Sequence, residues 1–195
     1  MKTRTATPAL FLMALMLNVG VTSVYAQPGR PVNVHVKMTF SGNAGPSTIN
    51  LNQPNTSTVE ENVAGDGPLG PFTFRNVSAT ANSPYPSSTC SGLFFPRVAG
   101  AGILRFQDGS LLTVNLTQGG DCIDLVHLVG HCTLTFQISG GTGRFRDASG
   151  VLTLTETAHP VLADAFSNPV FFTETGHLTG TVSGIAEEEA RDERR

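Results

Sequence analysis

The chain has 195 residues, and its 15 Asp and Glu outnumber its 12 Lys and Arg. An acidic surface of this kind argues against nucleic acid or an anionic membrane as the partner. Glycine contributes 21 residues, above the average share of roughly 7%. Threonine and valine are also plentiful, and this mixture is typical of strands joined by tight turns.

The first 26 residues have the pattern of a secretory signal peptide. Lys2 and Arg4 supply a positive start, and residues 10–21 form an apolar run that is too short and too interrupted to span a bilayer. Small residues then place the expected cleavage before Gln27. The alternative is an uncleaved membrane anchor. The pattern predicts a secreted or periplasmic protein that is soluble after cleavage.

The mature chain is expected to form one domain over residues 27–185, followed by a charged, flexible tail at 186–195. It would carry 10 basic and 15 acidic residues, a net charge of −5. Export to an oxidising compartment favours a disulfide among the three cysteines. Each pairing leaves one thiol over.

The pairing that we favour is Cys122–Cys132, because it closes a local loop, and Cys90–Cys122 is the main rival. Cys122 and Cys132, together with His127 and His131, do not have the spacing of a zinc motif. We therefore expect no metal site there.

Period-two alternation of apolar and polar residues dominates the chain and predicts strands. Its clearest example is residues 32–40, in which Val34, Val36, Met38 and Phe40 share one face with Val32. Further strands are expected at 72–81, 99–106, 110–118, 131–139, 151–158 and 170–184, with a short one near 57–63 inside the loop-rich segment 41–71. Loops are expected at 82–92 and 159–169, and no long helix is predicted. Several short strands separated by turn signals indicate a sandwich or a barrel.

The most patterned stretch is SGGTGRFRDASG, residues 139–150. A phosphate-binding loop would need a helix after it, whereas a threonine-rich strand follows here. We therefore interpret the stretch as a turn. Its glycines can take a positive φ or allow a close approach, and its one large apolar side chain would close a barrel end. The residues with these turn roles are Gly140, Gly141, Gly143, Gly150 and Phe145, with Arg144 and Arg146 flanking Phe145 and Asp147 as a countercharge.

The run FQISGGTGRFRDASGVLTLT, residues 136–155, resembles the late hairpin of allene-oxide-cyclase-like and dirigent-like barrels, and among these the uncharacterised secreted bacterial members. A looser resemblance in LGPFTFR, DGSLLTVNL and TGTVSG extends over most of residues 30–185. It implies a single eight-stranded antiparallel barrel of the calycin type, often dimeric or trimeric. It also implies no metal or nucleotide cofactor and a reactive hydrophobic molecule inside the barrel. No catalytic motif allows active residues to be carried over.

Two carboxyl groups are candidates for the interior of such a barrel. Alternation places Glu156 with Leu152 and Leu154, and Glu174 with Phe172 and Leu178, on the inward faces of two consecutive strands. Such a pair would have separated pKa values and could act as acid and base, as in a cofactor-free cyclase or isomerase.

These two strands are expected to pair with Ala158 near Val170, which would make the glutamates diagonal neighbours, roughly 5–8 Å apart. A register shift of one residue would instead turn both to solvent. They could also lie at the barrel mouth, paired with Arg105 or Arg146.

Three classes of function stay open: a carrier of a small hydrophobic ligand, the cyclase or isomerase with Glu156 and Glu174, and a structural or surface-associated protein without a pocket. A hydrolase has little support, because the chain has no Gly-x-Ser-x-Gly motif. A single catalytic histidine is a further alternative, and the candidates are His35, His127, His131, His159 and His177.

Overall fold

The computed structural model describes residues 32–165 and 168–186. The expected signal peptide lies outside the described residues, and so does nearly all of the expected tail. Among the described residues, no helix has the length and apolar character needed to cross a bilayer.

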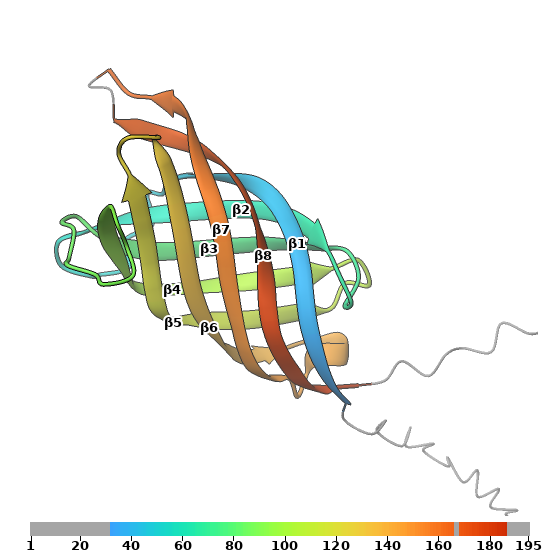
Figure 1. Ribbon diagram of the computed structural model, residues 1–195. Helices are drawn as coiled ribbons and strands as arrows, with labels where there is room; N and C mark the ends of the chain where they lie inside the picture. The colour runs from blue at the N-terminus through green and yellow to red at the C-terminus, as the bar shows by residue number, and fades with distance from the viewer. Residues whose placement is uncertain (1–31, 166–167, 187–195) are drawn as a thin grey trace, which may run out of the picture.

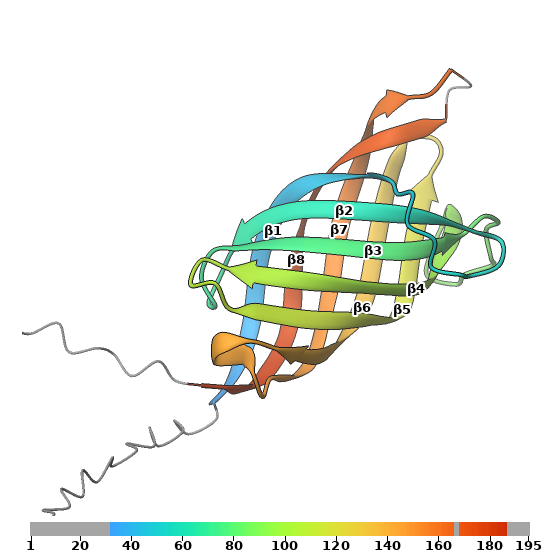
Figure 2. The same cartoon turned by 180° about the vertical axis from the view of Figure 1, so that it is seen from behind.

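Eight antiparallel strands form a closed barrel in which each strand pairs with its neighbours in sequence and β1 also pairs with β8. The strands cross at a steep tilt, as Figures 1 and 2 show from opposite sides. The predicted single antiparallel barrel of eight strands is confirmed. The strands are β1 (Val32–Pro46), β2 (Thr56–Asp66), β3 (Phe72–Ala81), β4 (Leu93–Phe106), β5 (Leu111–Asp124), β6 (Val129–Gly141), β7 (Ser149–Ala163) and β8 (Pro169–Ile185).

The seven connections alternate between two ends of the barrel. One end, which we call the η1 end, holds the β2–β3 and β4–β5 turns and the 3₁₀ helix η1 (Gly143–Phe145) between β6 and β7. The opposite end, the loop end, holds the β1–β2 and β3–β4 loops, the β5–β6 turn and the projecting β7–β8 hairpin.

The half of the interior near the η1 end is filled by apolar side chains. Alternation along β1 illustrates the cause, because Val36, Met38 and Phe40 are buried while Lys37 and Thr39 between them are exposed. Aromatic rings from other strands complete this packing, with Phe74 and Phe136 in edge-to-face contact at 5.8 Å between ring centroids. This half of the barrel is a packed core.

The turn between β6 and β7 closes the η1 end. Phe145 is fully buried, with its ring centroid 4.7 Å from that of Phe106. Gly140, Gly143 and Gly150 have φ of 149°, 59° and 135°, in the region that favours glycine. Gly141 does not, but an added Cβ there would lie 2.5 Å from backbone oxygens of Leu111 and Phe145.

The arginine beside Phe145 takes a different partner from the expected one. Arg144 stacks over the Phe145 ring and pairs with Asp108 of the β4–β5 turn at 3.0 Å. The sequence had placed Asp147 as the countercharge. Asp108 is 36 residues away in sequence, and only barrel closure brings its turn beside η1.

Several strands are longer than predicted. The segment 119–130, where no strand was predicted, is mostly strand, because β5 continues to Asp124 and β6 begins at Val129. The segment 159–169 is likewise shortened, since β7 continues to Ala163. β1 continues to Pro46, and β2 spans 56–66 where a short strand near 57–63 was expected.

The favoured disulfide Cys122–Cys132 is wrong, and the structure joins Cys90 to Cys122, with 5.6 Å between their Cα atoms. The register pairs Cys132 with Asp121 and Cys122 with His131. Because adjacent residues of a strand point to opposite faces, Cys122 and Cys132 lie on opposite sides of the barrel wall. Cys132 is a buried free thiol.

Candidate functional site

Glu156 of β7 and Glu174 of β8 both lie inside the barrel, each with only 3% of its surface exposed. The predicted inward phase of both strands is therefore correct, although their register is not. Glu156 pairs with Gly176, and Glu174 pairs with Ala158, a shift of four residues from the expected pairing. A shift by an even number of residues leaves each side chain on the same side of the sheet. The two glutamates are therefore still diagonal neighbours.

A third carboxyl group that the sequence analysis did not single out completes a cluster with them. Glu61 of β2 is 1% exposed, and Glu61, Glu156 and Glu174 each place a carboxyl oxygen within 4.8 Å of the others. We call these three residues the carboxyl cluster. Glu61 comes from β2, far in sequence from β7 and β8, and meets the other two only across the interior of the barrel.

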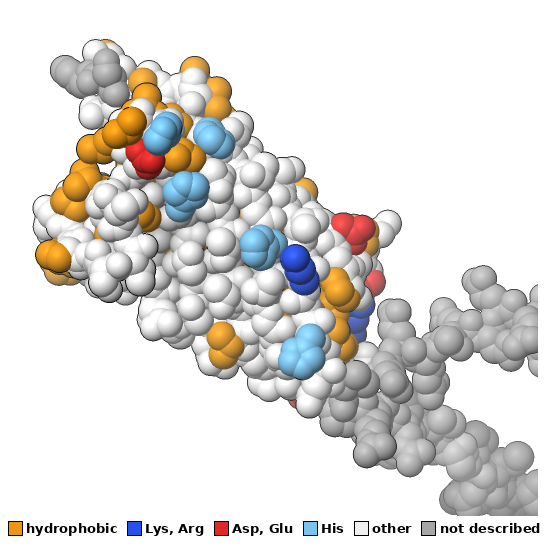
Figure 3. Space-filling view, in the orientation of Figure 1, with side chains coloured by type: hydrophobic (Ala, Val, Ile, Leu, Met, Phe, Trp, Pro, Cys, Tyr) orange, Lys and Arg blue, Asp and Glu red, His pale blue; other side chains and the backbone are white. Residues whose placement is uncertain are grey.

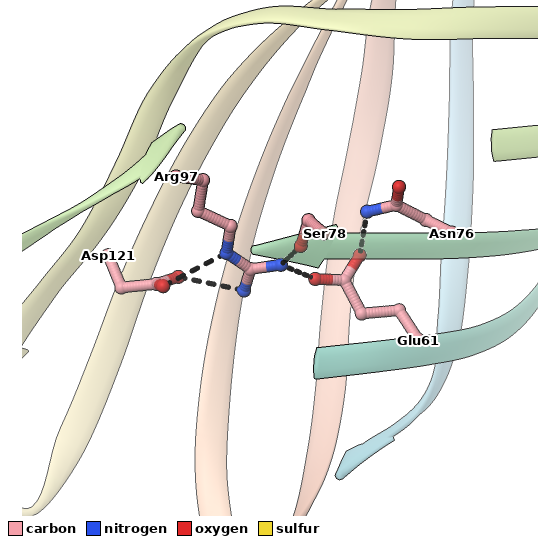
Figure 4. Close-up of polar contacts among 5 residues, drawn as sticks. All are labelled: Glu61, Asn76, Ser78, Arg97 and Asp121. Carbon is pink, nitrogen blue, oxygen red and sulfur yellow. Dashed lines mark hydrogen bonds and ion pairs between the residues drawn. The ribbon is translucent and has the colours of Figure 1, made fainter. Parts of the chain in front are cut away.

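Arg97 of β4 connects the carboxyl cluster to the opposite wall (Figure 4). Its Nε and Nη2 each donate to one oxygen of Asp121 at 3.0 Å, a two-pronged pairing that fixes the guanidinium plane. Its Nη1 donates to Ser78 Oγ at 2.8 Å and to Glu61. The second oxygen of Glu61 accepts from Asn76 Nδ2 at 3.0 Å. Glu61 thus has a partner for each oxygen.

The other two carboxyl groups are not satisfied in this way. Among the described residues, no hydrogen-bond partner reaches either carboxyl oxygen of Glu156 or the Oε2 of Glu174, and all three atoms are buried. Buried polar atoms normally have a partner. These unpaired oxygens are free to accept a hydrogen bond from a ligand, to take up a proton or to coordinate an ion.

Burial is the main reason that the carboxyl groups resist ionisation. It raises the pKa of Glu156 well above the usual range, and the charges of Glu61 and Glu174 raise it further. For Glu174, burial and then Glu61 raise the pKa to about 8. The sequence had predicted that the pKa values of this pair would separate, with one glutamate readily ionised. Instead both pKa values are raised, because burial acts on both carboxyl groups and the charge of Glu61 adds to it.

The neighbouring groups respond to the same environment. Burial would lower the pKa of Arg97, but Asp121 and Glu61 outweigh it and raise that pKa well above its usual value. Cys132 lies opposite Glu156 in the register, and burial raises the pKa of its thiol well above the usual range. Six of the eight strands thus each send one ionisable side chain into this half of the interior.

Half-buried apolar side chains form a ring between the carboxyl cluster and the loop end. Each lies two residues from an inward ionisable residue on the same strand, so alternation turns it inward as well. The register agrees, since Phe95 pairs with Asp121 and Ala158 with Glu174. We call this set the apolar ring: Val59, Phe95, Ile123, Ala158 and Phe172.

Comparisons with known proteins identify a structural similarity only. No family model matches the sequence, and no curated protein is significantly similar to it. The structure is similar to that of the pterocarpan synthase dirigent protein PsPTS1, at 14% identity and a TM-score of 0.43 over 83% of this chain and 99% of that one. For the pterocarpan synthase dirigent protein GePTS1 the values are 13% and 0.37, over 88% and 98%.

At identities of 13–14% and TM-scores of 0.37–0.43, this similarity says nothing about family or site, so the site of the barrel has to be judged on its own geometry.

The histidines lie on the outside of the barrel (Figure 3). His35 is exposed and its ring contacts Thr181 Oγ1 at 3.1 Å. His127 lies in the β5–β6 turn, 2.7 Å from Asp124, and His131 and His159 are also exposed. His177 of β8 is half-buried and faces outward, because it pairs with the exposed Thr39 and stands next to the inward Leu178. None of the five points into the interior beside the carboxyl cluster, so a catalytic histidine would have to act on the outer surface.

Two open hollows, of about 350 and 300 Å³, lie at the η1 end rather than near the carboxyl cluster. The first is lined by backbone and side chains around Gly70 and Gln107 and by the Asp108–Arg144 ion pair. Arg144 Nε has no hydrogen-bond partner there, but its charge is paired with that of Asp108. The buried carboxyl oxygens of Glu156 and Glu174, which have neither a hydrogen bond nor a counter-charge, lie toward the other end, and this is why we place the site there.

Sequence reasoning missed Glu61, Arg97 and Asp121 for separate reasons. Glu61 stands in the run EEN, where three polar residues in succession hide the alternation. Arg97 follows Phe-Phe-Pro, and Asp121 stands after Gly-Gly in a segment where no strand was predicted. The available signal was the strand partner, because Glu61 pairs with Asn76 and Asn76 lies on the face of Phe72 and Phe74.

Proposed function

We propose that this barrel is an exported protein that binds a small hydrophobic molecule at its loop end, inside the apolar ring. Ligand sites are concave and mostly apolar, with a few convergent polar groups that fix orientation. The ring supplies the apolar walls, and the carboxyl cluster below it supplies the polar groups. The observation that carries the proposal is the set of unpaired, buried oxygens on Glu156 and Glu174 directly beneath the ring.

The shape of the preferred ligand follows from this arrangement. A molecule with one polar end would direct it toward Glu156 and Glu174 and leave its apolar body against Phe95 and Phe172. Burial of the apolar body would provide most of the affinity, at about 25 cal/mol per Å² removed from water. The polar end would decide which molecules are accepted, because an analogue without it leaves the buried carboxyl groups unpaired.

The experiment is native mass spectrometry of the protein purified from the medium or periplasm of its own cells, followed by titration with the neutral apolar dye Nile red. We expect a co-purifying small molecule and saturable dye binding at one site. Ala158→Trp, which fills the ring, should weaken dye binding at least tenfold. Val126→Trp, on the exposed β5–β6 turn, is the matched control and should leave it unchanged.

A clean mass without a ligand, together with no saturable dye binding, would reject the proposal. It would favour the third class of function, a structural barrel whose interior is filled by its own side chains. If Ala158→Trp fails to fold, Phe172→Ala serves instead, since loss of one wall of the ring should also weaken the binding of the dye.

A second candidate function is a cofactor-free cyclase or isomerase in which Glu156 and Glu174 act on the bound molecule. The position of the two carboxyl groups as diagonal neighbours below the ring favours it. The test compares the products formed from the co-purifying molecule by the wild type, Glu156→Gln and Glu174→Gln. Conversion that is lost in both variants, while dye binding is retained, would support catalysis. Full activity in both would exclude it.

A further inference from the structure

The half of the barrel at the loop end holds more negative than positive groups. Among the described residues, four carboxyl groups line this interior, those of Glu61, Asp121, Glu156 and Glu174, and one guanidinium, that of Arg97, faces them. Arg97 divides its donors between Asp121 and Glu61 and reaches neither of the others. Buried carboxylates without a counter-charge are costly. The interior therefore has room for additional positive charge beside Glu156 and Glu174.

The carboxyl cluster has the dimensions of a coordination sphere. Calcium–oxygen distances are about 2.3–2.6 Å, so two ligands of one ion lie at most about 5 Å apart. One carboxyl oxygen from each of Glu61, Glu156 and Glu174 lies within 4.8 Å of the other two. One ion between them could contact all three without any movement of the backbone.

The lone pairs needed for coordination are free. Both oxygens of Glu156 and one of Glu174 have no hydrogen-bond partner, and both side chains are more than nine-tenths buried. Each oxygen of Glu61 accepts one hydrogen bond and keeps a second lone pair. Its donors, Arg97 and Asn76, hold the carboxylate in place, as outer partners of metal-ligating carboxylates do.

We propose that Glu61, Glu156 and Glu174 bind one divalent cation of the oxygen-preferring class, such as Ca²⁺ or Mn²⁺. All three ligands are hard carboxylate oxygens, which suit these ions rather than copper or zinc. This inference replaces the expectation of no metal that the cysteine and histidine spacing supported. That spacing concerned residues around the β5–β6 hairpin, whereas the carboxyl cluster is assembled from three separate strands.

The test uses the full-length mature protein, stripped with EDTA and held at about pH 9 so that protons do not compete for the oxygens. Mn²⁺ is titrated and followed by electron paramagnetic resonance, and Ca²⁺ is added in a thermal melt. We expect one Mn²⁺ per chain and a rise of about 5 °C in the melting temperature at saturating Ca²⁺.

Three variants locate the ion. Glu156→Gln and Glu174→Gln should each weaken Mn²⁺ binding at least tenfold. Both substitutions are isosteric, and if one variant fails to fold, the other still tests the site. Glu60→Gln is the matched control, because Glu60 is the neighbour of Glu61 on the outer face and pairs there with Arg75. It should bind Mn²⁺ like the wild type.

No stoichiometric Mn²⁺ binding, or binding that all three variants retain equally, would overturn the inference. Nile red titration of the same metal-free protein is read separately, so the proposed ligand binding and the cation site can fail independently. The cation also competes with the second candidate function for the same two carboxyl groups. Tight binding of the ion would exclude a reaction in which Glu156 and Glu174 themselves exchange protons with the substrate.

Discussion

At the scale of single residues, Arg97 is the group on which the polar interior depends. In the part of the chain that the structure describes, it is the one arginine or lysine that is buried, and its side chain bridges β2, β3 and β5 through Glu61, Ser78 and Asp121. Removing one partner of a buried ion pair leaves the other charges uncompensated.

Arg97→Met should therefore lower the free energy of unfolding by about 3–5 kcal/mol, measured by urea denaturation. Arg75→Met provides the control, because Arg75 is an exposed arginine that pairs with Glu60 on the outer face. We expect a change of at most about 1 kcal/mol there. Equal effects from the two substitutions would show that the interior network contributes no more than a surface pair.

The raised pKa of Glu174 predicts how stability depends on pH in the absence of metal. The folded protein keeps the proton up to about pH 8, whereas the unfolded chain releases it near 4.5. Between these values the folded state binds more protons, so the free energy of unfolding falls as the pH rises. Glu156, whose pKa is also raised, acts in the same direction.

Urea titrations in EDTA at about pH 5 and pH 8.5 measure this fall. Glu174→Gln removes one of the two titrating groups and should make the dependence shallower, with its largest stabilising effect at the higher pH. A profile that is identical in wild type and variant would mean that Glu174 is ionised in the folded protein over the whole range.

Strand alternation predicts which side of the sheet a side chain points to better than it predicts which residue lies opposite on the next strand. Glu156 and Glu174 stand in clean alternating runs, and their inward direction follows from the sequence. That Glu61 lies beside them does not, because it depends on the diameter and stagger of the whole barrel. The role of these residues in catalysis stays a prediction.

At the scale of elements, the β5–β6 hairpin shows how glycine misleads sequence interpretation. Gly119 and Gly120 suggest a loop, yet both lie within β5. Gly119 has a φ of 130° and follows an irregularity in the β5–β6 register at Leu116 and Gln118. An added Cβ at Gly119 would lie 2.1 Å from the Thr133 oxygen. Glycine here permits strong bending of a strand.

The register of this longer hairpin determines which of the three cysteines form the disulfide and which one stays a free thiol. We expect a thiol reagent to modify no cysteine of the native protein and one, Cys132, after denaturation, with peptide mapping that links Cys90 to Cys122. Cys90→Ser should lower the free energy of unfolding by about 2–4 kcal/mol, since it opens a constraint across the β3–β4 loop. A linked Cys122–Cys132 peptide would contradict the hairpin register.

At the scale of the whole molecule, closure of the barrel was predictable from the resemblance and the spacing of turn signals, while the division of its interior was not. The apolar residues of the η1 end follow from alternation. The polar residues of the other half can be predicted as one cluster only if it is known which positions of six strands lie at the same height in the barrel. The strand registers determine this.

Closure predicts that the body of the barrel, apart from the projecting β7–β8 hairpin, has no exposed strand edge. β1 and β8 are paired along nearly their whole length, from Val34 opposite Val182 to Ala44 opposite Phe172. Amide hydrogen exchange of these two strands should therefore be as slow as that of β3 and β6, and all should exchange through global unfolding. Fast exchange confined to β1 and β8 would indicate an open sheet.

Because β1 pairs with β8, the barrel can close only after the last strand has been synthesised. β1 emerges from the ribosome more than a hundred residues before β8, which is roughly 10 s at ordinary rates of synthesis. Until β8 arrives, one edge of β1 has no neighbour and the interior is open to water. Such a chain cannot adopt its final shape before β8 has been synthesised.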